Sequence, residues 1–92
     1  MLNIASTSYS VTLSWEQSSS PDAAGYEILG YNIFRSTTSG GPYVQLNSSL
    51  IAGTTYADTT VADGTTYYYV ATVVDSSNAE SGYSAQIEAV IP

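Results

Sequence analysis

The side chains of this 92-residue sequence that could carry out chemistry are eight carboxylates and nine tyrosines, because histidine, cysteine and lysine are absent. Arg35 is the only cation. Nucleophilic triads rely on a general base that is most often histidine, so this type of catalysis is excluded. A lysine Schiff base and a Walker-type phosphate loop both need lysine, and disulfides and thiolate metal sites need cysteine. The sequence excludes all of these.

Carboxylates alone can hydrolyse glycosides or bind Ca²⁺, and both uses make geometric demands. A glycosidase holds two carboxylates at a fixed separation across a cleft, which a chain of this size rarely offers. Ca²⁺ takes about six to eight oxygen ligands, often from closely spaced carboxylates. Asp58, Asp63 and Asp75 are spread along the sequence, and residues 75–80 lack the EF-hand pattern. We therefore predict that the chain is not an enzyme and has no catalytic residue, metal site or cofactor.

The charge balance restricts the partners. The net charge is −7, and only 10% of the residues are charged. Nucleic-acid binding needs clustered lysine and arginine, and an anionic membrane surface attracts the same residues, so neither partner is expected. No apolar run approaches the roughly 20 residues that span a bilayer. A polar surface of serine and threonine suits an extracellular protein, so we expect the chain to be secreted or extracellular as part of a larger protein.

Short apolar alternations separated by turn residues predict a fold built from strands alone. In residues 11–15, Val11, Leu13 and Trp15 alternate with polar side chains, which is typical of a half-buried strand. Further strands are predicted at residues 2–4, 25–35, 43–46, 54–57, 65–74 and 83–91. This spacing predicts one domain over residues 1–92 with an all-β fold, a seven-stranded antiparallel sandwich of two sheets.

A local repeat interrupts this pattern. Residues 25–29 (GYEIL) are followed directly by residues 30–34 (GYNIF), and the two pentapeptides share Gly, Tyr and Ile in order. Side chains in a strand alternate with a period of two residues, so an offset of five reverses the faces. Both copies can present Tyr and Ile to one core only if a bulge or turn intervenes, and we predict it at Gly30.

Four segments resemble fibronectin type III domains: residues 11–15 (VTLSW), 30–36 (GYNIFRS), 40–43 (GGPY) and 63–67 (DGTTY). The resemblance extends over residues 2–92 and is strongest to the bacterial modules appended to secreted carbohydrate-active enzymes and surface proteins. It implies an immunoglobulin-like sandwich in which Trp15 is the core tryptophan and Val61 anchors a turn. Tyr67 would be the tyrosine-corner residue, with its hydroxyl bonded to backbone near that turn. Such domains are mostly spacers or adhesion modules.

Alternation and the resemblance together identify two groups of residues. Tyrosine offers rigid amphipathic contact area, and aromatic rings also stack on sugars, so tyrosines outside the core are candidate contacts. Residues 47–49 (NSS) fit the sequence motif for N-glycosylation (a sequon), and this match is interpreted as accidental. The expected core residues are Leu13, Trp15, Tyr31, Ile33, Tyr56, Val61, Tyr67 and Tyr69, and the candidate interaction residues are Tyr26, Ile28, Leu29 and Tyr83.

Three functions remain open from the sequence. The first is a non-catalytic spacer or binding module of a secreted multidomain bacterial protein, with the neighbouring domains as its partners. The second is an engineered fibronectin type III scaffold or assembly subunit, in which the duplicated segment 25–34 self-associates by strand pairing or exchange. The third is a module that binds carbohydrate or protein through loop tyrosines.

Overall fold

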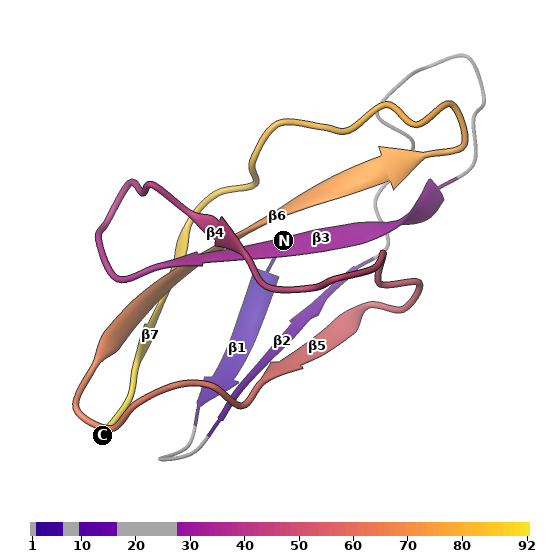
Figure 1. The fold of residues 1–92 in the computed structure, drawn as a ribbon. Coiled ribbons are helices and arrows are strands. Elements are labelled where there is room, and N and C mark those ends of the chain that lie inside the picture. The colour runs from indigo at the N-terminus through magenta and orange to yellow at the C-terminus, as the bar shows by residue number, and fades with distance from the viewer. Residues whose placement is uncertain (1, 7–9, 17–27) are drawn as a thin grey trace.

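The computed structural model describes residues 2–6, 10–16 and 28–92, which form two antiparallel sheets packed face to face (Figure 1). One sheet has the strand order β1-β2-β5 and the other β4-β3-β6-β7. The described residues contain no helix that could cross a membrane. This confirms the predicted all-β sandwich of two sheets. The strands are β1 (Leu2–Ser6), β2 (Val11–Trp15), β3 (Ile28–Ser36), β4 (Val44–Gln45), β5 (Thr55–Asp58), β6 (Thr66–Asp75) and β7 (Ile87–Val90).

The core lies between the sheets and follows the two-residue period of the strands. Val11, Leu13 and Trp15 of β2 are buried while Thr12 between them is exposed, because alternate side chains point to opposite faces. The rings of Trp15 and Tyr31 meet edge to face, with 5.3 Å between centroids. Of the expected core residues, Leu13, Trp15, Tyr31, Ile33, Tyr67 and Tyr69 are buried, and Tyr56 and Val61 are partly buried against them.

The strand expected over residues 83–91 is shorter than predicted, because serine side chains replace part of its backbone ladder. The amide of Val73 donates to Ser81 Oγ (3.0 Å), while Ser81 N donates to the Val73 carbonyl (2.9 Å). Ala71 and Ser84 repeat the arrangement at 2.9 and 2.8 Å. Residues 81–86 therefore run beside β6 without strand geometry, and regular pairing starts only at β7.

The register of β3 and β6 shifts between Ile28 and Gly30, which confirms the bulge predicted at Gly30. Ile28 lies opposite Asp75 and Gly30 opposite Val74, so Leu29 is the extra residue. The bulge returns Ile28 to the inner face, where it packs against the core. Glycine is required beside it, since a Cβ on Gly30 would lie 2.8 Å from the carbonyl oxygen of Ile51.

The turn before β6 is closed by Tyr67. Its hydroxyl accepts a hydrogen bond from the Ala62 amide at 2.8 Å, which is the tyrosine-corner contact that the resemblance implies. Gly64 in this turn has φ +70°, a conformation that favours glycine. Its amide donates to the carbonyls of Ile91 and Pro92, both at 3.1 Å, so the turn is tied to the end of the chain.

A buried carboxylate connects the two sheets. Asp58 of β5 has a side chain that is only 2% exposed, and its Oδ2 accepts hydrogen bonds from Arg35 Nη1 (2.8 Å) and Tyr69 Oη (2.6 Å) of the opposite sheet. Its Oδ1 accepts from the amide and the hydroxyl of Thr60 at 3.0 and 2.6 Å. The Arg35 guanidinium also lies 4.8 Å from the centre of the Tyr67 ring. Each oxygen of the Asp58 carboxylate therefore accepts two hydrogen bonds, and one of those to Oδ2 comes from the cation Arg35.

These contacts set the protonation of the cluster. Burial by itself would raise the pKa of the Asp58 carboxyl, but hydrogen bonds from Thr60, Tyr69 and Arg35 outweigh it and hold the pKa below its usual 3.8. Burial and the bond to Asp58 raise the pKa of the Tyr69 hydroxyl. Burial would lower the pKa of Arg35, yet the hydrogen bond and charge of Asp58 leave it raised. At neutral pH Asp58 is therefore a carboxylate that accepts hydrogen bonds from a cationic donor, Arg35, and from a neutral donor, Tyr69.

Gly30→Ala tests the close approach at the bulge. The new methyl group meets backbone atoms of residue 51, so we expect a loss of about 1–3 kcal/mol in the free energy of unfolding. Urea denaturation followed by Trp15 fluorescence measures it. The matched control is Gly53→Ala, where a Cβ meets nothing within 4 Å and a change below about 0.5 kcal/mol is expected. Equal effects at the two glycines would contradict the bulge packing.

Asp58→Asn tests the link between the sheets. The folded-state pKa of Asp58 is depressed, so its stabilisation is present above the unfolded pKa and is lost as the pH falls through the folded value. We expect the variant to be less stable than the wild type by about 2–3 kcal/mol at pH 7, because Arg35 then lacks its partner. The difference should shrink at about pH 3 and below. Thermal unfolding of both proteins across this pH range measures the difference in stability. A difference that does not change with pH would refute the depressed pKa of Asp58.

Candidate functional site

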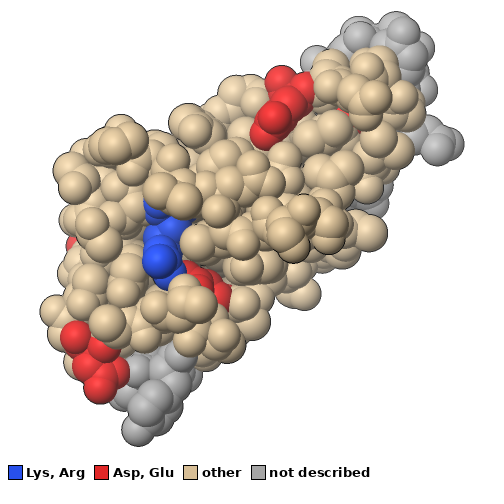
Figure 2. Space-filling model, in the orientation of Figure 1, with Lys and Arg blue, Asp and Glu red and all other residues tan. Residues whose placement is uncertain are grey.

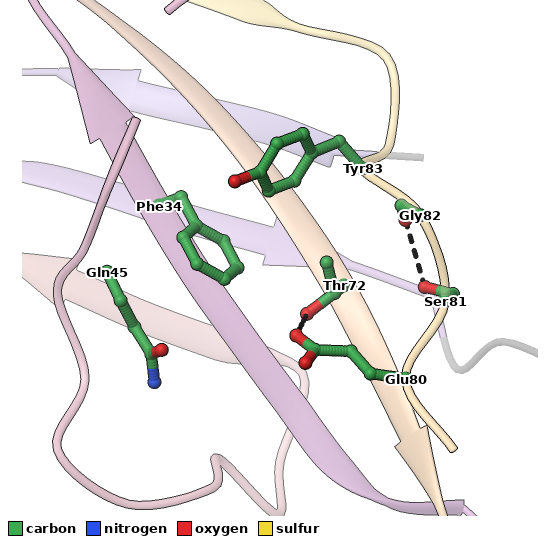
Figure 3. Close-up of a pocket in the computed structure, with 7 residues that line it drawn as sticks. All are labelled: Phe34, Gln45, Thr72, Glu80, Ser81, Gly82 and Tyr83. Carbon is green, nitrogen blue, oxygen red and sulfur yellow. Dashed lines mark hydrogen bonds between the residues drawn. The ribbon is translucent and has the colours of Figure 1, made fainter. Parts of the chain in front are cut away.

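An open pocket of about 420 Å³ lies on the outer face of the β4-β3-β6-β7 sheet (Figure 3). Ile33 and Val73 point into the core, so their strand neighbours Phe34 and Thr72 point outward and form its floor. Gln45 enters from β4, and the segment that follows β6 supplies the far wall. The residues that line the pocket are Phe34, Gln45, Thr72, Glu80, Ser81, Gly82 and Tyr83.

Two aromatic rings, Phe34 and Tyr83, line one end of the pocket, and a third, Tyr43, packs against Tyr83. Tyr83 meets Phe34 and Tyr43 edge to face, with 5.1 and 5.2 Å between ring centroids. The Tyr43 hydroxyl donates to the side-chain carbonyl of Gln86, which also accepts from the Gly40 amide at 2.7 Å. These bonds tie the β3–β4 turn to the segment before β7. Tyr83 remains 55% exposed, so one large ring stands at the rim in contact with solvent.

A polar network occupies the other end. Glu80 Oε2 accepts from the Thr72 hydroxyl (2.5 Å) and from Asn32 Nδ2 (3.2 Å). Asn32 Oδ1 in turn accepts from Gln45 Nε2 (3.2 Å) and Asn47 Nδ2 (2.8 Å). Asn32 therefore links the carboxylate on one side of the pocket to the amide on the other.

Asn47 holds this network in place. It is buried, its Oδ1 accepts from the Ile33 amide at 2.8 Å, and its Nδ2 also donates to the Ser49 carbonyl at 2.9 Å. Beyond the end of the short strand β4, the Asn47 side chain thus takes the place of the backbone carbonyl that would otherwise pair with β3. Its amide is fully engaged inside the protein, which agrees with the interpretation of the sequon as accidental.

The arrangement is suited to binding. The lining contains one carboxylate, Glu80, and none of the described residues form a group of three or more acidic, histidine or cysteine side chains that could hold a metal ion. In the view of Figure 2 most of the visible surface carries no charge, and the blue patch, which is Arg35 because the sequence has no other Lys or Arg, lies beside a red acidic one. Uncharged rings and hydrogen-bonding groups dominate the contacts that a ligand would find here.

Of the candidate interaction residues that the structure describes, Tyr83 lies in a different place from Ile28 and Leu29. Tyr83 is at the pocket rim, Leu29 is 44% exposed at the bulge, and Ile28 is partly buried against the core. Tyr26 lies outside the described residues. The structure instead groups Tyr83 with Phe34 and Gln45, which sequence reasoning missed. Reading the outward positions of the two longest predicted strands would have identified Phe34 and Thr72.

The alternative in which segment 25–34 pairs with another chain is not favoured for residues 31–34, because both edges of β3 already make backbone hydrogen bonds within the chain. One edge pairs with β6 throughout. On the other edge, Tyr31 exchanges hydrogen bonds with Ile51 at 3.0 Å, and the Ile33 carbonyl accepts from Leu46 at 2.8 Å. Residues 25–27 lie outside the described part of the chain.

Comparison with known proteins identifies relatives of this chain by sequence. No family model matches the sequence. The chain is 42% identical over 84 residues to an amylopullulanase of Thermoanaerobacterium saccharolyticum, a match that covers 89% of this chain and 6% of the enzyme. It is 43% identical over 61 residues to an amylopullulanase of Thermoanaerobacter thermohydrosulfuricus, covering 66% of this chain and 4% of that enzyme. The chain thus spans only a small part of the length of these relatives.

Solved structures share the fold. Titin module A71 from human cardiac muscle superposes with a TM-score of 0.76 at 22% identity, covering 97% of this chain and 82% of the module, a likeness of fold alone. An Fn3-like protein from Clostridium thermocellum superposes with a TM-score of 0.72 at 34% identity, covering 94% of this chain and 84% of that protein. Given this identity over nearly the full length of both proteins, the chain belongs to the fibronectin type III-like family.

Proposed function

We propose that the chain is a non-catalytic module appended to a larger secreted bacterial protein, in which it spaces and contacts the neighbouring domains. The observation that carries this proposal is the match of 89% of the chain to 6% of an amylopullulanase. A segment of that size is one small unit within a much longer enzyme. The described fold extends 44 × 23 × 21 Å, an elongated shape that suits a spacer.

The roles of the acidic residues support a non-catalytic module. Asp58 is buried in the link between the sheets, and Asp75 Oδ1 accepts from the amides of Ser77 and Ala79 at 2.9 and 3.1 Å, which shapes the turn after β6. Glu80 is held by Thr72 and Asn32. The sequence offers no histidine, cysteine or lysine that could act as a base in their place.

Secretion is part of the proposal and rests on composition. The surface is polar through serine, threonine and amide side chains, with 10% charged residues and no cysteine that oxidation could damage. Contact with neighbouring domains would use the exposed apolar side chains of Leu29, Val44 and Val90, which lie outside the pocket.

Two alternatives from the sequence receive different support. An engineered assembly subunit is not favoured, because natural enzymes contain close relatives of the chain and β3 is paired on both edges. Binding of carbohydrate or protein is supported by one observation, the exposed ring of Tyr83 above a pocket with hydrogen-bonding groups.

Incubation of the purified chain with pullulan and soluble starch tests the non-catalytic assignment. We expect no release of reducing ends above the buffer background, because the lining of the pocket contains a single carboxylate. The control is the same preparation carrying Glu80→Gln, which should behave identically. A saturable rate of hydrolysis that Glu80→Gln abolishes would overturn the proposed function.

Static light scattering tests the assembly alternative. The chain and a version lacking residues 25–29 should both have the mass of a monomer, 9.7 kDa for the full chain. The shortened version should fold, because it keeps every pair of β3 with β6 from Gly30 to Ser36 and loses only the Ile28–Asp75 pair beyond the bulge. Association of the full chain alone would show instead that residues 25–29 pair between molecules.

A further inference from the structure

We propose that the pocket between β3, β4, β6 and residues 80–83 binds one or two sugar units of a neutral oligosaccharide. A volume of about 420 Å³ falls within the range of small-molecule sites. This inference goes beyond the proposed function, since a module can join domains without any ligand.

The apolar side offers ring faces to the C–H groups of a sugar. The π-face of an aromatic ring carries partial negative charge, and the C–H bonds of a pyranose carry partial positive charge. Tyr83 is 55% exposed, and its ring is held in place by T-shaped contacts with Phe34 and Tyr43. Figure 3 shows the rings of Tyr83 and Phe34 at the same end of the pocket. A sugar can therefore stack without ordering a mobile side chain.

The polar side offers acceptors to hydroxyl groups. Glu80 uses Oε2 for Thr72 and Asn32, and Gln45 uses Nε2 for Asn32 and the Asn47 carbonyl. Among the described residues, no hydrogen bond ends on Glu80 Oε1 or Gln45 Oε1. These two oxygens flank the pocket, and Asn32 fixes the side chains that carry them. Two positioned acceptors beside an aromatic face fit a ligand that combines C–H surface with O–H donors, as a pyranose does.

The charges favour a neutral ligand. An anion would meet the carboxylate of Glu80 and a chain of net charge −7, and the only cation, Arg35, is held by Asp58. A cationic peptide would be attracted by Glu80 and by the rings. However, Glu80 already receives two hydrogen bonds, and the rest of the lining is uncharged. We therefore assign the site to a saccharide and use a cationic peptide as the competing outcome.

The test is a titration of the ¹⁵N-labelled chain, followed by amide chemical shifts, with maltohexaose, cellohexaose and tetralysine as separate probes. We expect at least one hexaose to give saturable shifts at Phe34, Thr72 and Gly82, with a Kd on the order of 1 mM. Tyr83→Ala should weaken this binding about tenfold, because the stacking face is lost. Tyr83→Phe keeps the ring and should bind within about twofold of the wild type.

Val90→Ala is the matched control, since it truncates an equally exposed apolar side chain on β7 outside the pocket and should leave the Kd unchanged. Thermal unfolding of each variant checks that the fold is intact. Three results would overturn the proposal: no saturable shifts with either hexaose up to about 20 mM, full binding by Tyr83→Ala, or tighter binding of tetralysine at the same amides. None of these bears on the non-catalytic assignment, which the hydrolysis assay tests separately.

Discussion

The carboxylate of Asp58 lies between the two sheets and accepts hydrogen bonds from Arg35 and Tyr69, which are direct cross-strand partners on β3 and β6. A buried charge is tolerated only when it is paired and hydrogen-bonded, so both partners must face inward at the same level. A slip of one residue in either strand would turn one partner to the outer face. This contact therefore fixes the distance between the sheets and the register of the two longest strands together.

The outer face of the four-stranded sheet follows from that register. Once Ile33 and Arg35 point inward, Asn32 and Phe34 must point outward, and Thr72 of β6 lies directly opposite Asn32. The floor of the pocket is thus a consequence of core packing. Its walls depend on segments outside the long strands, and these are held by side-chain hydrogen bonds, through Asn47 on one side and through Ser81 on the other.

The sequence was sufficient to predict those parts of the structure that follow from a single short-range rule. Alternation predicted the strands and the inward tyrosines, and the five-residue offset predicted the bulge beside Gly30. It was insufficient where a side chain takes the place of backbone. Ser81 and Ser84 shorten the last strand, and Asn47 caps the edge of β3, because each pairs with a residue at least eight positions away. The pocket depends on these contacts, so the sequence suggested Tyr83 but not its neighbours.

The placement of charge also determines what the surface can recognise. With Arg35 committed to Asp58, no other lysine, arginine or histidine side chain exists in the sequence to attract an anion at the surface. Recognition on the outer sheet face must then use rings, amides, hydroxyls and carboxylate oxygens, of which only the amide nitrogens and the hydroxyls donate. At the pocket the donors of Thr72, Asn32 and Gln45 are directed to Glu80 and Asn32, which leaves Glu80 Oε1 and Gln45 Oε1 as acceptors. The same pairing that stabilises the core therefore selects, at the surface, for uncharged ligands rich in hydroxyl donors.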